Sequence, residues 1–370
     1  MANIFDYLTW RGDLTFTQDP PNAVDALIFS TLTYVSYGEK AETLPAQALS
    51  LRECAREFFS LEAPENRVRT KRDMELLRRA ADTVRFGQTK LCMYRSAFLP
   101  EEETQFAAMT FLLDDGSMFV AFRGTDNSLV GWKEDFNMTF QQTIPAQRLA
   151  QQYIRDAALE HSAPMRVAGH SKGGNLAVFA AARTSPMLRK RILEVFNNDG
   201  PGFTKYMIGD PGYAAIVPRI RTYIPQSSVI GMLLEHEEPY QVVRSKNVGI
   251  MQHDPYSWEV EGPAFLQVAE VTESSQFLDA TIKNWFASMS NQERNRLVEV
   301  LYTLLTTGEV ENAVDIFQPK NIRTYVKTLT SDADMRHVLS TEFQGLLEAA
   351  KRARASMEQK ALPPRSDSGE

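Results

Sequence analysis

A serine between two glycines constrains this chain more than any other feature, because a strand signal ends there and a helix signal begins. Residues 165–182 read MRVAGHSKGGNLAVFAAA, a β-rich run followed by the pentapeptide GHSKG (169–173) and an Ala-rich helical stretch. In a nucleophile elbow the serine lies at the strained apex of such a turn, and the glycines avoid collisions with neighbouring backbone. The order strand, sharp turn, helix therefore predicts Ser171 as a nucleophile, with an ordinary tight turn as the alternative.

Composition narrows the class of protein. The chain is 43% hydrophobic and 24% charged, values typical of a soluble globular protein, and its net charge of −7 argues against nucleic acid as the main partner. The two cysteines, Cys54 and Cys92, give neither a disulfide framework nor a metal-site spacing, so we expect no metal or cofactor. Without a signal-peptide pattern or an apolar run of about 18 residues, the sequence predicts a cytoplasmic protein without a spanning helix.

Strand and helix signals alternate along the first three quarters of the chain. Helical periodicity covers residues 24–37, 44–60, 71–86 and 145–161, and β-rich runs cover 105–113, 117–123, 192–197, 219–224 and 240–248. The DDG at 114–116 separates two β-rich runs and indicates a hairpin. This alternation predicts an α/β fold with a mostly parallel sheet flanked by helices.

The character of the chain changes at about residue 274, where β signals fade. Helical periodicity continues over 276–288, 291–308, 319–329 and 334–358. We therefore expect an α/β domain with an N-terminal helical segment over residues 1–273 and a helical C-terminal extension over 274–360. The polar, Pro- and Ser-rich tail over 361–370 is predicted to be disordered.

A serine nucleophile needs a base to accept its proton and a carboxylate to orient that base. The chain has five histidines, and His253 follows the last β-rich run in a loop, where a hydrolase base is expected. The other four fit less well. His161 ends a helix, and His170 points to the opposite side of its strand. His236 lies in a turn interpreted as solvated and charged, and His337 belongs to the helical tail.

The carboxylate is best supplied by Asp199. It ends a β-rich run in the segment VFNNDGPGF (195–203), whose Gly-Pro-Gly turn would hold it at the carboxyl edge of the sheet. An Asx turn that supports the same loop is the alternative interpretation. Glu235 and Glu237 lie after the next β-rich run and stay open as substitutes, whereas Asp254 is adjacent to His253 and has poor geometry.

An acyl-transfer site also needs two donors for an oxyanion. The backbone N–H of Lys172, directly after Ser171, supplies one of them. The loop that follows residues 117–123 supplies the other through Thr125, which offers a backbone N–H and a hydroxyl. An ordinary turn in which Arg123 pairs with a nearby carboxylate is the alternative for that loop.

These residues match a known family. Residues 119–136, FVAFRGTDNSLVGWKEDF, together with the later GHSKGG, resemble the strand, oxyanion loop and W-x-x-D segment of the class 3 lipases. Those enzymes are α/β-hydrolases that cleave triacylglycerols and related esters. The resemblance implies an α/β-hydrolase fold, Ser171 as nucleophile and Thr125 and Lys172 as oxyanion donors. It also implies that residues 126–142 occupy the region of the lid.

Almost the whole chain also resembles a bacterial family of lipase-like proteins, the Mbeg-like group. The motifs that carry this resemblance are YLTWRGDLTF (7–16), GHSKGGNLA (169–177), NDGPGF (198–203) and HDPYSW (253–258).

One departure from the class 3 lipases affects the acid. Those lipases carry it in a D-x-V-P motif after the next strand, whereas residues 225–232 here read PQSSVIGM and contain no carboxylate. Lipases of the pancreatic type place the acid one strand earlier, in a D-x-x-G-P turn. That resemblance favours Asp199.

The sequence therefore predicts a serine hydrolase of carboxylic esters, with acyl lipids as candidate substrates. Two alternatives remain: a non-catalytic α/β-hydrolase scaffold that binds a ligand or protein, and an acyltransferase or thioesterase that uses the same residues. A lipid surface could be contacted through residues 136–140. The Lys172 side chain could favour anionic substrates, but we expect it to point to solvent.

Overall fold

The computed structural model describes residues 1–37, 49–126, 128–308, 315–316 and 318–361. The chain folds into two compact units, the first over Met1–Val271 and the second beginning at Thr272. The predicted disordered tail lies outside the described residues, except that Ala361 ends the last helix.

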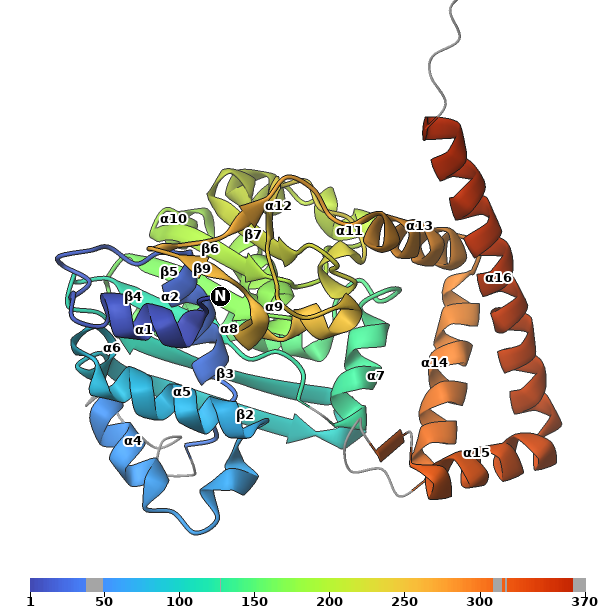
Figure 1. Ribbon diagram of the computed structural model, residues 1–370, viewed down its shortest axis with the longest axis horizontal. Coiled ribbons are helices and arrows are strands. Elements are labelled where there is room, and N and C mark those ends of the chain that lie inside the picture. Colours follow the sequence, from blue (N-terminus) through green and yellow to red (C-terminus); the bar gives the residue numbers. More distant parts are fainter. Residues whose placement is uncertain (38–48, 127, 309–314, 317, 362–370) are drawn as a thin grey trace, which may run out of the picture. The chain divides into compact units, whose positions relative to one another are not determined.

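A mixed sheet forms the centre of the first unit (Figure 1). Within the described residues it has nine strands, in the spatial order β1 (Leu49–Ser50), β2 (Lys90–Leu99), β3 (Thr104–Leu112), β4 (Met118–Phe122), β5 (Met165–His170), β6 (Ile192–Asn198), β7 (Ile220–Pro225), β8 (Tyr240–Val243) and β11 (Gln267–Val268). The pairings from β4 to β8 are parallel, and the pairings on either side of them are antiparallel. The predicted parallel sheet is thus confirmed for its central strands.

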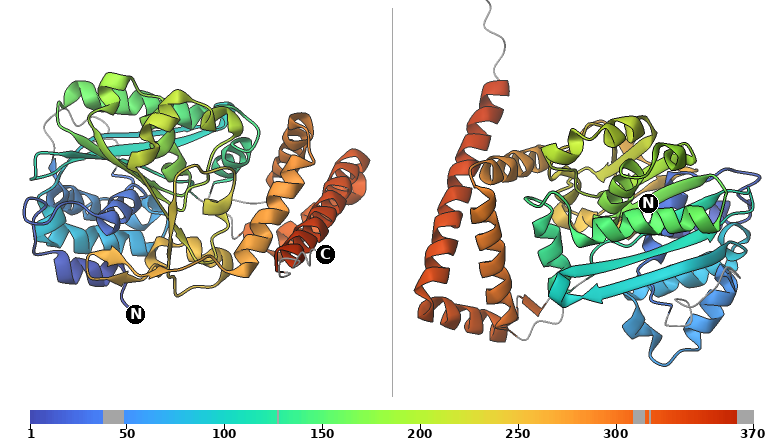
Figure 2. Two further views of the ribbon diagram at one scale, coloured as in Figure 1. Left: turned by 90° about the horizontal axis from the view of Figure 1, so that it is seen from above. Right: turned by 180° about the vertical axis from the view of Figure 1, so that it is seen from behind.

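Helices cover both faces of the sheet, as the left view of Figure 2 shows. One face carries the helices that precede β2 in sequence: α1 (Ile4–Arg11), α2 (Ala23–Leu32), α4 (Leu51–Phe59), α5 (Lys71–Asp82) and α6 (Val84–Gly87). The other carries crossover helices: α8 (Pro145–Glu160), α9 (Lys172–Ala182), α10 (Pro186–Arg189), α11 (Lys205–Ile208) and α12 (Pro211–Ile216). Helix α7 (Leu129–Asn137) packs beside β3.

Alternation along the central strands explains the two cores. In β4, Phe119 and Ala121 belong to the core under the N-terminal helices, while Val120 and Phe122 belong to the core under α8 and α9. Successive side chains of a strand point to opposite faces, so a strand covered on both sides is apolar throughout.

The structure corrects several predicted boundaries. Strand β2 was not predicted; it has a register shift between Cys92 and Arg95, and Met93 there has a φ of 54°. The helix expected over 24–37 ends at Leu32, and the described part of that expected over 44–60 begins at Leu51. The strand expected over 240–248 ends at Val243. The hairpin turn is confirmed, with Gly116 at a φ of 79°.

The helices α1, α2, α4, α5 and α6 form what we call the N-terminal layer. A buried ion pair anchors this layer. Arg85 donates to both carboxylate oxygens of Asp25 at 2.8 and 2.5 Å, and both side chains are fully buried. The Tyr7 hydroxyl donates to Asp25 at 2.8 Å, and the Asn22 amide donates to that hydroxyl. The Arg85 guanidinium also lies 4.2 Å from the ring centroid of Phe16. The YLTWRGDLTF motif thus contributes Tyr7 and Phe16 to a network that spans the N-terminal segment.

We expect Arg85→Met to lower the free energy of unfolding by about 3–5 kcal/mol, because it leaves the Asp25 carboxylate buried without its cation. Arg79→Met is the matched control. Arg79 pairs with Glu75 within α5, and the two side chains are 49% and 43% exposed. Urea titrations followed by circular dichroism measure both changes. Equal losses in the two variants would contradict the network's role.

The second unit is helical. It contains α13 (Glu273–Ala287), α14 (Asn291–Thr306), α15 (Pro319–Ser331) and α16 (Ala333–Ala361). Helix α16 packs against the other three (Figure 1), and Leu304, Tyr325 and Met335 form a small core between α14, α15 and α16. In the described part of the chain, no helix is long and apolar enough to cross a membrane.

Candidate active site

Ser171 lies in the predicted strand, turn and helix arrangement. It follows β5, precedes α9 and has a φ of 60°, which is unfavourable for a residue with a side chain. Close backbone approach explains both glycines. A Cβ on Gly169 would lie 2.0 Å from the Gly173 carbonyl, and one on Gly173 would lie 2.3 Å from the Phe122 carbonyl oxygen. The turn therefore holds a strained serine at the carboxyl edge of the sheet.

Asp199 lies beside the elbow. His170 of β5 pairs in register with Asn198 of β6, so the residues that follow them, Ser171 and Asp199, leave neighbouring strands at the same edge. Asp199 is fully buried and has a φ of 53°. Like Ser171, it occupies a strained backbone position of the kind that clusters at functional sites.

The carboxylate of Asp199 is bound on both oxygens. Its Oδ2 accepts a 2.6 Å hydrogen bond from His253 Nδ1. Its Oδ1 accepts from the Ser228 hydroxyl at 2.5 Å and from the Gly231 N–H at 3.1 Å. Ser228 and Gly231 belong to the segment that lacks a carboxylate, and that segment instead binds the Asp199 carboxylate, which follows the neighbouring strand. Sequence reasoning had assigned neither residue a role.

His253 ends a short 3-10 helix, and its side chain is 25% exposed. Because an ionised carboxylate only accepts hydrogen bonds, Nδ1 of His253 carries the proton and Nε2 of the neutral ring is left to act as a base. The substitutes for the acid lie elsewhere. Glu235 and Glu237 are exposed, and the backbone of Glu235 pairs with Phe203. The structure therefore pairs His253 with Asp199.

Contacts with the N-terminal layer hold the loop that carries His253. The Tyr256 hydroxyl donates to Asp73 at 2.7 Å, and Arg72 forms a 2.8 Å ion pair with Asp254. Arg72 also lies 4.8 Å from the ring centroid of Tyr256. The HDPYSW motif is thus anchored to α5 on both sides of its proline.

The loop after β4 places Gly124 and Thr125 next to the elbow. A Cβ on Gly124 would lie 3.0 Å from the Ser171 Cβ. The Thr125 hydroxyl donates to the Asp135 carboxylate, with oxygen–oxygen distances of 2.7 and 2.6 Å. That hydroxyl is engaged, so the group that Thr125 has left for an oxyanion is its backbone N–H. Asp135 comes from the W-x-x-D segment and was not assigned by the sequence.

The expectation that Lys172 points to solvent is wrong. Its ammonium is fully buried and pairs with the fully buried Glu134 carboxylate at 2.6 Å. It also donates to the Gln105 carbonyl at 2.8 Å, and Glu134 accepts from the Gln105 and Ala146 N–H groups. Burial is possible because the two charges are paired and both charged groups make further hydrogen bonds. Helix α7 therefore supplies adjacent carboxylates to the side chains of Lys172 and Thr125.

Asp135 of α7 leads to a prediction about how stability depends on pH. Burial raises the pKa of Asp135 from 3.8 to about 6, although the Lys172 ammonium and the Thr125 hydroxyl act in the opposite direction. Between about pH 4 and pH 6 the folded protein binds this proton more tightly than the unfolded chain, so ionising Asp135 lowers stability as the pH rises.

We expect Asp135→Asn to remove this loss. Urea midpoints of the variant, relative to the wild type, should rise from about pH 4 to pH 6 and then stay level. The amide oxygen of the variant can still accept from the Thr125 hydroxyl, and any change in that hydrogen bond adds an offset that does not vary with pH. A difference between the two proteins that is constant across this range would contradict the assignment.

The turn around His236, interpreted as solvated, is also corrected. Glu238 is buried, and it accepts hydrogen bonds from Tyr213 and Thr222 at 2.6 and 2.7 Å. His236 Nδ1 lies 3.0 Å from the same carboxylate. These contacts hold the pKa of Glu238 at about 2 despite its burial. This cluster ties β7 to α12.

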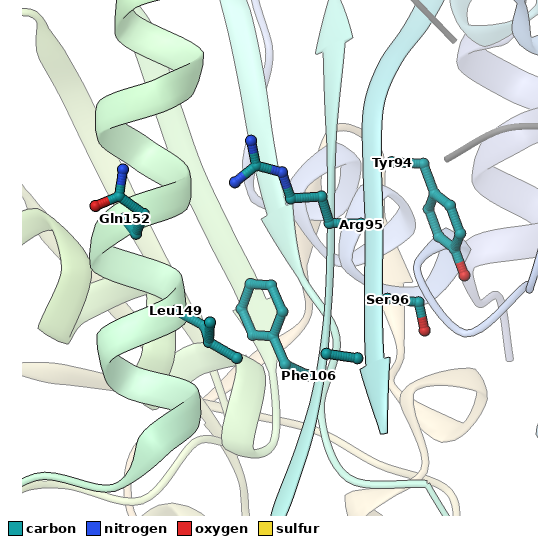
Figure 3. Close-up of a pocket in the computed structure, with 7 residues that line it drawn as sticks. Tyr94, Arg95, Ser96, Phe106, Leu149 and Gln152 are labelled. Atoms are coloured by element: carbon teal, nitrogen blue, oxygen red, sulfur yellow. The ribbon is translucent and has the colours of Figure 1, made fainter. Parts of the chain in front are cut away.

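A surface pocket lies away from these residues. Arg95 and Phe106 of the sheet and Leu149 and Gln152 of α8 line it, as Figure 3 shows, while Tyr94 points to the other side of β2. Its lining includes none of the residues that surround the elbow. Within the described ranges, no group of three or more His, Cys, Asp or Glu side chains is arranged to hold a metal ion.

The Mbeg1-like family model matches residues 80–303, and the chain belongs to that family. A search of curated proteins finds no match.

Solved structures that resemble the chain include lipases. The Rhizomucor miehei lipase propeptide complex has a TM-score of 0.36 and 12% identity, over 60% of this chain and 68% of that one. Lipase II from Rhizopus niveus has a TM-score of 0.35 and 14% identity, over 60% and 79%. An MDLA mutant from Penicillium cyclopium has a TM-score of 0.35 and 15% identity, over 60% and 81%.

Proposed function

We propose that this protein is a serine hydrolase with an α/β-hydrolase fold that cleaves carboxylic esters, with acyl lipids as the substrate class. The observation that carries the proposal is the 2.6 Å hydrogen bond between His253 Nδ1 and the buried Asp199 carboxylate, at the same sheet edge as Ser171. A strained serine, an oriented imidazole and a carboxylate are the parts of a catalytic triad.

In the proposed reaction, the Ser171 hydroxyl attacks the ester carbonyl and its proton passes to His253 Nε2. Asp199 stays ionised and stabilises the imidazolium that forms. The backbone N–H groups of Thr125 and Lys172 donate to the tetrahedral oxyanion. The imidazolium then protonates the departing alcohol, and water releases the acyl group from Ser171 by the same steps in reverse.

The burial of Lys172 bears on the substrate. Its ammonium is paired with Glu134, so the two charges offset each other and the ammonium is not exposed for an anionic substrate. The proposed role of Lys172 therefore rests on its backbone N–H. For contact with a lipid surface, the segment 136–140 offers Phe136, which is 42% exposed, whereas Met138 is buried.

We expect Ser171→Ala to lose fluorophosphonate labelling and to lower kcat on nitrophenyl esters by about 10⁴-fold or more. Asp199→Asn should lower kcat by about 10⁴-fold, because the imidazole is no longer held in the reactive tautomer. Glu235→Gln and Glu237→Gln are the controls and should keep wild-type rates.

Two results would overturn the assignment. A folded wild-type protein that never labels and never releases nitrophenol would support the non-catalytic scaffold instead. Full activity in Asp199→Asn together with a loss in Glu235→Gln or Glu237→Gln would move the acid to the other strand.

Acyl transfer and thioester hydrolysis use the same residues as ester hydrolysis. Product analysis separates these reactions. When water and an alcohol or thiol are both present, the acyl group of the acyl-enzyme is transferred partly to water and partly to the alcohol or thiol. We expect free acid as the main product; a predominance of acylated alcohol or thiol would identify a transferase.

A further inference from the structure

A second histidine lies directly against the proposed base. His170 precedes Ser171, and strand alternation turns its ring to the face of the sheet covered by the N-terminal helices, away from the serine side chain. Its ring centroid lies 4.6 Å from that of His253, with an angle of 33° between the rings. His170 is fully buried. Two imidazoles thus pack together beneath the proposed site.

The hydrogen bonds of His170 fix its tautomer. Its Nε2 lies 2.8 Å from the backbone carbonyl oxygen of His253, which can only accept, so Nε2 carries the proton. In the neutral ring Nδ1 then accepts, and the Tyr34 hydroxyl, 3.2 Å away, is the donor. The result is a directed chain from Tyr34 through His170 to the backbone of His253.

The surroundings keep His170 neutral. Burial lowers its pKa well below 6.5, and the neighbouring His253 and the Arg69 guanidinium lower it further. Burial also raises the pKa of Tyr34 to about 12, so that its hydroxyl stays protonated and remains a donor. Arg69 lies 4.0 Å from the Tyr34 ring centroid. The guanidinium thus lies on the Tyr34 ring, and its positive charge opposes protonation of His170.

We propose that His170 and Tyr34 are positioning residues for His253. This inference rests on the proposed function, in which His253 becomes an imidazolium during the reaction. Asp199 orients the ring from one side through Nδ1, and His170 holds the backbone of the same residue and packs against its ring. A neutral partner can do this without opposing the positive charge that His253 acquires. The acidic groups facing His253, Asp199 and Asp135, favour the same charge.

Two substitutions of His170 separate the hydrogen bond from the packing. His170→Gln retains an N–H donor for the His253 carbonyl, whereas His170→Phe retains an aromatic ring but loses the donor. We expect His170→Phe to lower kcat by about 10- to 100-fold with KM within about twofold of wild type, because a displaced base affects the chemical step. His170→Gln should recover most of the lost kcat.

Tyr34→Phe is the milder variant if His170→Phe folds poorly. It removes the donor to His170 Nδ1, and we expect a several-fold loss of kcat and of the fluorophosphonate labelling rate. Tyr153→Phe is its matched control, because Tyr153 is a buried tyrosine whose hydroxyl bonds to Met93 and Thr110 away from the elbow. That variant should keep the wild-type kcat even if its stability falls.

Nitrogen NMR of ¹⁵N-histidine-labelled protein gives a readout independent of turnover. His170 should stay in the Nε2–H tautomer from about pH 6.5, where an unperturbed histidine is half protonated, to pH 9, without titrating. Titration of His170 within this range, or wild-type kcat in both His170→Phe and Tyr34→Phe, would overturn the inference. If instead Ser171→Ala were as active as the wild type, the proposed function itself would fail.

Discussion

Close backbone approach between three chain segments is the constraint on which this site depends. The glycines of the elbow, Gly169 and Gly173, and Gly124 of the preceding loop lie where any Cβ would meet main-chain atoms at 2.0 to 2.4 Å. Their absence of side chains lets β4, β5 and the start of α9 come together around Ser171. The strain at Ser171 and the position of the Thr125 N–H both follow from this approach.

Two layers of charge and hydrogen bonding support the site from opposite faces of the sheet. On one face, adjacent carboxylates of α7 hold the side chains of Lys172 and Thr125. On the other, α5 holds the loop of His253 through Tyr256, and His170 of β5 donates to the backbone carbonyl of His253. The residues that would react therefore come from the sheet edge and its loops, and side chains of α5, α7 and β5 help to orient them.

Local sequence patterns predicted the turns and strands that neighbouring residues determine. They did not predict contacts between residues that lie far apart in the chain. The elbow, the hairpin at Gly116 and the central parallel strands follow from turn residues and alternation. The burial of Lys172 could not be read from the sequence, because its partners Glu134 and Gln105 come from other segments. The pairing of Asp199 with His253 agrees with the chain order, whereas the packing of His170 on His253 depends on how a loop folds back across the sheet edge.

The anchoring of the HDPYSW loop has a consequence for biosynthesis. Asp73 and Tyr256 are 183 residues apart in the chain, yet their hydrogen bond helps to place His253. At a synthesis rate of about 5–20 residues per second, α5 leaves the ribosome about 10–40 s before its partner does. During this interval, the surface of α5 that later contacts the loop lacks that partner. The nascent chain therefore completes this site only after most of the chain has been synthesised.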